Sequence, residues 1–218
     1  MIIRRSIIFY LNRDEIFTFP LAYYLIKRLS LKYNIFIKLG KTSIRKKIKI
    51  ILIILLDGSI KNLNYFYKKR ISINKLLLKK NVKIEKNNNI DYEFGLSINY
   101  PTKIINSKTD IYNFHFGNFK FQRGSFIFFY KYVYKWTSID LSFHKIIKKL
   151  DSGIILNKRT ISVKKMNALN MVSIPLRNKD FYFKSVKKIK KKIKRSKIQI
   201  GPLNKEPSFF KIFKTKFI

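Results

Sequence analysis

Short apolar runs rich in β-branched and aromatic residues alternate along this chain with longer stretches of helical periodicity. The first run, 6–11 (SIIFYL), is typical of a buried strand, and the segment 19–33 that follows it repeats leucine and tyrosine on one helical face. Strands and helices that alternate at this spacing predict an α/β fold with a doubly wound, mostly parallel, Rossmann-like sheet. Ligands bind to such sheets at the carboxyl ends of the strands.

The same patterns place the other elements. The run 47–56 (KIKIILIILL) is apolar and β-branched, and it is much shorter than a membrane span, so we expect a buried strand there. A short strand at 82–84 (VKI) follows a predicted helix. Further strands are predicted at 34–39, 91–98, 111–116, 138–143 and 158–163, and further helices at 71–81 and 124–136.

The balance of charge is the most unusual property of the composition. The 218 residues include 49 lysines and arginines but only 11 acidic residues, which gives a formal net charge of +38. A field of this sign attracts polyanions, above all RNA, with a strong dependence on salt. Lysine, isoleucine and asparagine have A/T-rich codons, so drift in a reduced genome that leaves a solvated lysine surface is the alternative explanation.

The composition changes near the carboxyl end. Nine of the fourteen residues in 184–197 are basic, and an apolar stripe runs along them at helical spacing, which predicts a basic amphipathic helix. The remainder, 198–218, contains glycine and proline breakers and several phenylalanines, so we expect an irregular, aromatic-anchored tail. We therefore expect a catalytic domain over 1–183 and an extension over 184–218, with no membrane span and no signal peptide.

Few residues in the chain can carry chemistry. Without cysteine, disulfides, thiolate nucleophiles and cysteine metal sites are excluded, and we expect no metal. The two histidines are His115 and His144. Asn113, His115 and Asp151 form a plausible acyl-transfer set: an imidazole relays a proton, a carboxylate orients it, and an amide donates to an oxyanion. Gly153 follows the aspartate and allows a tight turn or a close backbone approach.

Four linked motifs resemble the catalytic domain of the folate-dependent formyltransferases, which include methionyl-tRNA, glycinamide ribonucleotide and sugar N-formyltransferases. That family carries Asn-x-His, Arg-Gly, Thr-x-His and Leu-Asp-x-Gly in this order, and the intervals here match the family intervals. The corresponding residues are Asn113-Phe-His115, Arg123-Gly124, Ser142-Phe-His144 and Leu150-Asp151-Ser-Gly153. The resemblance extends over roughly 6–190 and is dense only over 91–163.

The resemblance implies a formyltransferase fold and a role for each matched residue. Asn113 would polarise the formyl carbonyl, His115 would assist proton transfer, and Asp151 would hold the histidine and a water. The donor would be 10-formyltetrahydrofolate. The residues expected to bind it, with the pterin against the backbone, are Leu96, Ser97, Ile98, Asn99, Tyr100 and Gly153, and those expected at the acceptor substrate are Arg123, Gly124 and His144.

The chain also departs from the family pattern. The loop after the histidine is usually Pro-Ser-Leu-Leu-Pro, whereas 116–122 here reads FGNFKFQ, and Ile127 replaces a proline expected after Arg-Gly. The first strand is followed by LNRDEIF instead of a Gly-Thr-Pro turn. Members that formylate tRNA carry a second, barrel-like carboxyl domain, for which we expect no room in this chain.

Three functions remain open at this point. The first is N-formylation of methionyl-tRNA for translation initiation by a monomer that binds initiator tRNA, in a bacterial cytoplasm or an organelle matrix. The basic carboxyl helix would then stand in for the missing domain. The second changes only the acceptor, to an amino sugar or glycinamide ribonucleotide. The third is a non-catalytic, RNA-binding subunit of an organellar assembly.

Overall fold

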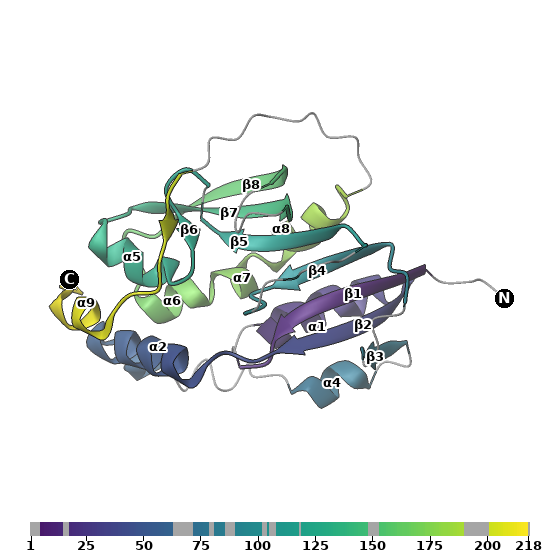
Figure 1. Cartoon of the computed structure of the whole chain (residues 1–218), viewed down its shortest axis with the longest axis horizontal. Helices are drawn as coiled ribbons and strands as arrows, with labels where there is room; N and C mark the ends of the chain where they lie inside the picture. The colour runs from purple at the N-terminus through teal and green to yellow at the C-terminus, as the bar shows by residue number, and fades with distance from the viewer. Residues whose placement is uncertain are drawn as a thin grey trace.

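The computed structural model describes residues 5–14, 18–62, 72–78, 81–85, 90–101, 104, 108–117, 119–147, 153–189 and 201–217. Its centre is a seven-stranded sheet with the strand order β3-β2-β1-β4-β5-β7-β8 (Figure 1). The strands are β1 (Arg5–Asn12), β2 (Tyr33–Gly40), β3 (Val82–Ile84), β4 (Phe94–Ile98), β5 (Ile111–Phe116), β7 (Ser138–Lys145) and β8 (Ile155–Ser162).

The first five strands of this sheet are parallel to their neighbours, and β7 and β8 are antiparallel. The predicted mostly parallel α/β sheet is therefore confirmed. The short strands β6 (Arg123–Gly124) and β9 (Leu203–Asn204) form a second, two-stranded sheet.

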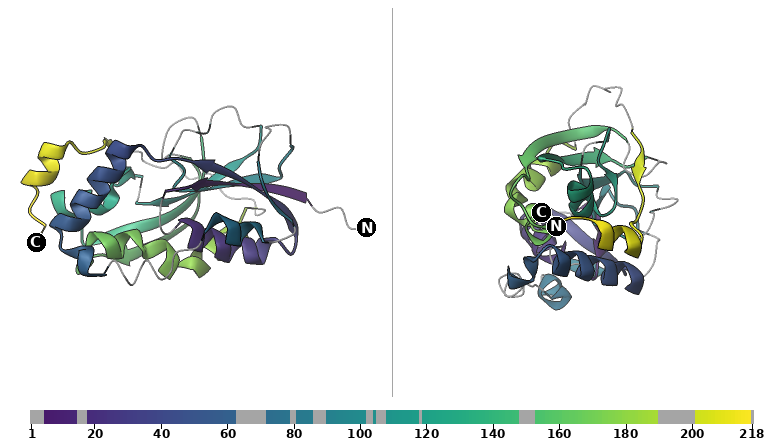
Figure 2. Two further views of the ribbon diagram at one scale, coloured as in Figure 1. Left: turned by 90° about the horizontal axis from the view of Figure 1, so that it is seen from below. Right: turned by 90° about the vertical axis from the view of Figure 1, so that its left-hand side faces the viewer.

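Helices pack against the central sheet on the side seen at the bottom of the left-hand view in Figure 2. Apolar side chains of α1 and α8 meet those of the strands there and form the main core. The helices are α1 (Thr18–Leu29), α2 (Ile44–Leu56), α4 (Ile73–Leu77), α5 (Ile127–Val133), α6 (Ala168–Val172), α7 (Ile174–Arg177), α8 (Lys179–Val186) and α9 (Phe209–Lys214), with a 3₁₀ turn η1 at Ser59–Asn62.

Successive side chains of β5 point alternately into the hydrophobic core and to the opposite face of the sheet, which carries the polar residues. Tyr112 and Phe114 point into the helix-side core and stack against Phe143 of β7. Asn113 and His115 therefore lie on the opposite face, because successive side chains of a strand point to opposite sides. The sheet thus presents two polar side chains from one strand on the face opposite α1 and α8.

The prediction of a strand at 47–56 is wrong, because these residues lie in helix α2. Ser43 starts the helix as its N-cap, with its hydroxyl accepting from the Lys46 N–H at 3.3 Å. Lys49 and Ile53, one turn apart, are the residues that become buried. Capping and packing of one helical face therefore override the β-propensity of the isoleucines. Five other apolar residues of this helix stay exposed: Ile44, Ile48, Ile51, Leu55 and Leu56.

The carboxyl segment 201–217 returns across the molecule to the end towards which the parallel strands run, where α9 lies beside α2 and α5 (Figure 1). Ile212 is fully buried in this contact. Lys49 of α2 reaches Glu206 at 2.7 Å, and the Tyr130 hydroxyl donates to the Lys205 carbonyl at 2.6 Å. The prediction of an irregular tail is therefore wrong for 201–217, which contains β9 and α9, whereas its anchoring by apolar side chains agrees with the buried Ile212. We call this segment the carboxyl strap.

Most of the predicted basic helix at 184–197 lies outside the described residues. The part that is described, 184–189, forms the end of α8 and the turn after it. None of the helices in the described part of the chain has the length and apolar character needed to cross a membrane.

Candidate active site

The pairing of β5 with β7 brings together three of the residues singled out in the sequence. Asn113 is the register partner of His144, and His115 is the register partner of Ser142. The Asn113 Nδ2 atom lies 3.3 Å from Nε2 of His144, whose Nδ1 lies 3.3 Å from the Lys145 carbonyl oxygen. Because a carbonyl only accepts, Nδ1 of His144 carries the hydrogen and its Nε2 accepts from the asparagine amide.

This arrangement gives His144 a supporting position. Its ring is 1% exposed and packs edge-on against Phe119, with centroids 4.7 Å apart. The neutral imidazole orients the Asn113 amide, and that amide keeps a second hydrogen that can donate to a carbonyl oxygen. The predicted contact of His144 with the acceptor stays a prediction.

His115 is held by the loop that follows its strand. Its Nε2 atom lies 2.8 Å from the carbonyl oxygen of Gln122, and the side chain is 6% exposed. Since that carbonyl accepts a hydrogen, Nε2 of His115 carries one. The predicted role of His115 in proton transfer stays a prediction.

The loop that supplies this carbonyl is built by hydrogen bonds instead of prolines. Gly117 has φ +131°, and an added Cβ would collide with the Gln122 carbonyl oxygen, so only glycine fits. Ser142 donates to the Gly117 carbonyl at 2.9 Å, and the Gln122 side chain donates to the Ser138 carbonyl at 2.9 Å. These contacts hold the loop in place without prolines. Gly117 and Gln122 are positioning residues that the sequence motifs did not identify.

Arg123 and Gly124 lie in β6, where they pair with β9 of the carboxyl strap. The Arg123 guanidinium is 9% exposed and donates to the Gly201 carbonyl. Gly124 has φ +95°, and a Cβ there would collide with the Asn204 carbonyl oxygen. Both residues thus join the loop after His115 to the strap. Their predicted contact with the acceptor stays a prediction.

The predicted folate-side segment 96–100 begins inside the sheet. The side chains of Leu96 and Ile98 point into the helix-side core, whereas Ser97 lies on the face that carries Asn113 and is its register partner on β4. This segment can therefore contact a ligand near Asn113 only through Ser97 and through the backbone beyond the end of β4.

The chain turns sharply where β4 ends. Asn99 has φ +51°, a left-handed conformation that asparagine tolerates better than most residues. Tyr100 lies edge-on to Tyr10 with centroids 5.3 Å apart, and together with Pro101 it packs so closely on Gly40 that no Cβ would fit there. This aromatic turn covers the carboxyl ends of β1 and β2 next to the Asn113 face.

Asp151, the predicted carboxylate of the set, lies outside the described residues. Gly153, two residues later, has φ +127°, and a Cβ would collide with the Lys145 carbonyl oxygen, which gives this glycine a packing role beside β7. Sequence reasoning overlooked Asp140, a buried carboxylate on the His144 side of β7. It accepts from Thr160 at 2.6 Å and pairs with Lys158 at 3.3 Å.

Metal ligation finds no support in the described ranges, where no three histidine, cysteine, aspartate or glutamate side chains gather closely enough to hold an ion. The groups the site offers are amide, imidazole and backbone. Together they can polarise a carbonyl and move a proton, which is the chemistry of acyl transfer to an amine.

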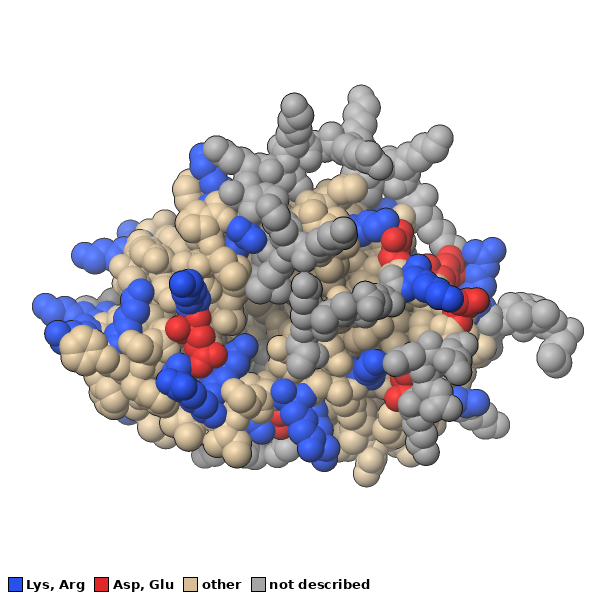
Figure 3. Space-filling view, in the orientation of Figure 1, with Lys and Arg blue, Asp and Glu red and all other residues tan. Residues whose placement is uncertain are grey.

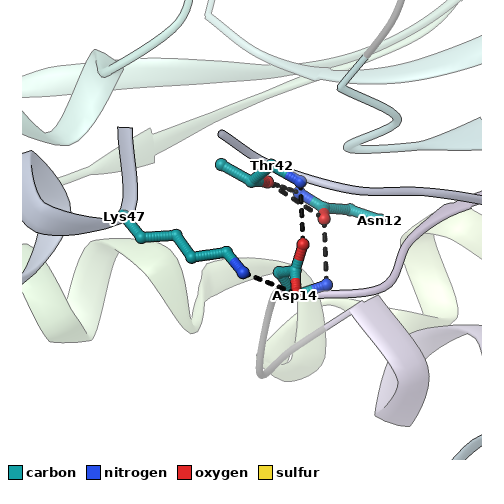
Figure 4. Close-up of polar contacts among 4 residues, drawn as sticks. All are labelled: Asn12, Asp14, Thr42 and Lys47. Carbon is teal, nitrogen blue, oxygen red and sulfur yellow. Dashed lines mark hydrogen bonds and ion pairs between the residues drawn. The ribbon is translucent and has the colours of Figure 1, made fainter. Parts of the chain in front are cut away.

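A polar network joins the loops after β1 and β2 at the same end of the sheet (Figure 4). Asn12 donates to the Thr42 hydroxyl at 2.9 Å, and Asp14 accepts from the Thr42 N–H at 2.8 Å. Lys47 of α2 completes the network, 2.8 Å from Asp14.

Replacing Asp14 with asparagine is expected to lower the stability by at most about 1 kcal/mol, because the pair is partly exposed. Burial alone would raise the Asp14 pKa, but the hydrogen bonds from Lys47 and the Thr42 N–H, with the charges of Lys47 and Arg13, lower it overall. Since the folded pKa lies below the unfolded value of 3.8, the contribution is present above that pH and is lost as the pH falls through the folded pKa.

Urea unfolding of both proteins at pH 7 and at pH 3 measures this effect. The difference between the two proteins should shrink at the lower pH. A difference that is equal or larger at pH 3 would contradict the assignment of charge to Asp14.

The sheet order and the polar end of β5 define an α/β protein with the formyltransferase fold, as the comparisons with solved structures establish. No protein-family model matches the sequence, and a comparison with curated protein sequences finds no match. The sugar 3N-formyl transferase WlaRD, in the presence of dTDP and 5-N-formyl-THF, superposes with a TM-score of 0.56 at 18% identity. The match covers 92% of this chain and 69% of that one.

Two other formyltransferases share the fold. Methionyl-tRNA formyltransferase from Clostridium thermocellum matches with a TM-score of 0.52 at 15% identity, over 94% of this chain and 74% of that one. Phosphoribosylglycinamide formyltransferase from Anaplasma phagocytophilum matches with a TM-score of 0.51 at 14% identity, over 84% of each chain. The predicted fold is confirmed, and the similarity extends well beyond the densely matching motifs.

Proposed function

We propose that this protein transfers a formyl group from 10-formyltetrahydrofolate to the amino group of methionyl-tRNA. The observation that carries the proposal is the placement of Asn113 and His115 on one face of β5, with an amide and an imidazole held by their hydrogen-bond partners. The formyltransferase fold and the four linked motifs of the sequence support the same reaction.

The residues account for each step of the transfer. The amine nitrogen attacks the formyl carbon, and the Asn113 amide donates a hydrogen bond to the oxyanion that forms. His115 takes the proton of the attacking nitrogen on Nδ1 and returns it to N10 of the folate as the carbon–N10 bond breaks. The products are the N-formyl amine and tetrahydrofolate, and Asp151 would orient the imidazole during both proton transfers.

In this proposal the donor binds at the end of β4. Adjacent strands lie about 4.8 Å apart, so a pterin held along the backbone after Ser97 would lie one strand away from Asn113. The backbone of 97–100 offers N–H and C=O groups to the edge of a flat heterocycle, and Tyr100 closes one side. Gly153 lies beside Lys145 at the end of β7, and its predicted contact with the folate stays a prediction.

The charge supports a tRNA acceptor over a small amine. Several carboxylates are already paired with basic side chains inside the protein: Asp14, Glu93, Asp110, Asp140 and Glu206. Figure 3 shows lysine and arginine spread over the visible face, with acidic side chains mostly beside them. A large excess of unneutralised positive charge remains for a polyanionic substrate.

A small acceptor is the second candidate. A sugar 3N-formyl transferase and a phosphoribosylglycinamide formyltransferase share this fold with TM-scores close to that of the methionyl-tRNA enzyme. The fold therefore serves all three acceptors. An amino sugar nucleotide or glycinamide ribonucleotide needs only a few positive groups, so the net charge does not favour it.

The test is a formyl-transfer assay with 10-formyltetrahydrofolate and three acceptors: charged initiator tRNA, glycinamide ribonucleotide and an amino sugar nucleotide. We expect transfer to the tRNA, and we expect Asp151→Asn to lower kcat by about one to two orders of magnitude because the imidazole loses its orienting charge. Transfer only to a small acceptor would move the proposal to the second candidate. A folded protein that binds no folate and formylates none of the three would overturn it.

A further inference from the structure

A hollow of about 360 Å³ lies between the end of α5 and α9. None of its lining residues belongs to the sheet face that carries Asn113. Its walls come from two segments that are distant in the sequence, 132–135 and 211–216. We call it the lysine hollow, after the four lysines among its lining residues: Lys135, Lys211, Lys214 and Lys216.

The charge of the lysine hollow is not neutralised within the described part of the chain, where none of its four lysines forms an ion pair with a carboxylate. Lys211 lies 4.9 Å from the ring centre of Tyr130, and Lys214 lies 4.2 Å from that of Phe210. Such contacts hold the ammonium groups in place but leave their charge intact.

Tyr132, which lines the hollow, donates its hydroxyl hydrogen to the carboxylate of Asp57 at 2.9 Å. This carboxylate also accepts from the backbone of Ala168 and from Ser59. Burial and this carboxylate raise the pKa of Tyr132, so its hydroxyl stays protonated and adds no negative charge. The hollow is therefore a region of positive potential with an aromatic wall.

The backbone at Lys135 is a second, independent observation. This residue has φ +50° and directly follows the C-cap Tyr134 of α5, and the Trp136 N–H bonds to the Lys131 carbonyl at 3.0 Å. That position of a helix end favours glycine, and a residue with a Cβ costs about 1 kcal/mol or more there. A basic residue near a helix end is ordinary, but one in a strained conformation that lines a cationic hollow points to a function.

We propose that the lysine hollow binds phosphate groups. Several ammonium groups around one cavity fit the closely spaced charges of a nucleic-acid backbone or of a nucleotide polyphosphate. α9 lies at the end of the molecule towards which β1, β2, β4 and β5 run (Figures 1 and 2). A phosphate chain bound there would thus lie at the same end of the fold as the ends of those strands.

Lys135→Gly is the decisive variant, because it removes a charge and relieves the backbone strain together. We expect its Tm to stay equal or rise, while its affinity for a fluorescein-labelled single-stranded RNA 12-mer falls about fivefold. Lys211→Gln combined with Lys214→Gln should weaken binding further. The slope of log K against log salt should fall by about 0.7 for each lysine removed.

Lys32→Gln combined with Lys83→Gln is the matched control, since both lysines are exposed and lie away from the hollow. It should leave affinity and slope nearly unchanged. A parallel titration with ATP separates the two sources of phosphate: a loss of affinity for RNA alone supports a nucleic-acid backbone, and a loss for ATP alone supports a nucleotide.

Hollow variants that bind both probes as the control does would overturn the proposal. The binding assay contains neither folate nor formyl acceptor. Its failure and a failure of the proposed catalysis are therefore separate results.

Discussion

Replacing His115 with alanine is expected to lower kcat for formyl transfer by about two to four orders of magnitude. The Nε2 hydrogen is donated to the Gln122 carbonyl, so in the proposed reaction the ring would exchange the proton through Nδ1. Alanine removes the group that accepts the proton of the attacking amine and returns it to the departing nitrogen. KM for the donor should change little, because the ring is buried and offers little surface for binding.

Ser142→Ala is the control for this variant. Ser142 is the register partner of His115 and donates to the Gly117 carbonyl of the same loop, but it has no part in the proton transfer. We expect it to cost about 1 kcal/mol of stability and less than tenfold in kcat. Steady-state kinetics with thermal unfolding of both variants make the comparison. A His115→Ala protein that keeps more than a tenth of the wild-type kcat would contradict the proposed base.

The sequence predicted most of the central sheet because its strands are buried and their pattern is strong. Alternation along 111–116 puts aromatic rings on one face and Asn113 and His115 on the other, and the structure has this arrangement. The parallel order follows from the helical segments between the strands, which leave few other topologies. Asn113, His115 and His144 lie close together because β5 and β7 are neighbouring strands of one sheet.

Other features could not be predicted because they depend on backbone groups and distant contacts. The partner of His115 is a carbonyl of Gln122, and any residue type supplies a carbonyl. Residues 44–56 form helix α2 and not a strand because Ser43 caps the helix and Ile53 packs against α5. No local sequence pattern reveals the second contact. The aromatic character of the strap after residue 200 is visible in the sequence, but its pairing with β6 is a tertiary contact that the local sequence does not reveal.

Asn113→Ala is expected to lower kcat by about two to three orders of magnitude, as the loss of one oxyanion donor does elsewhere. One amide hydrogen of Asn113 goes to Nε2 of His144, and in the proposed reaction the second would donate to the formyl oxygen. Alanine removes both, and it leaves Nε2 of His144 without this donor. We therefore expect an added loss of about 1 kcal/mol of stability, which corresponds to about 2–4 °C in Tm for a chain of this size.

Asn113→Asp separates these two effects, because it keeps the shape of the side chain and replaces the donor with a carboxylate. An extra negative charge beside the developing oxyanion should lower kcat at least as much as alanine does. His144 can protonate and restore the contact as an ion pair, so the Tm should fall less than in Asn113→Ala. A kcat for Asn113→Asp within tenfold of the wild type would contradict the donor role.

The double variant Asn113→Ala with His115→Ala tests whether the two residues act on one transition state. When two residues act together on one transition state, removing the second costs less in kcat once the first is already absent. We therefore expect the double variant to lose clearly less than the product of the two single losses. Fully multiplicative losses would mean that the two side chains contribute independently, with no coupling between them.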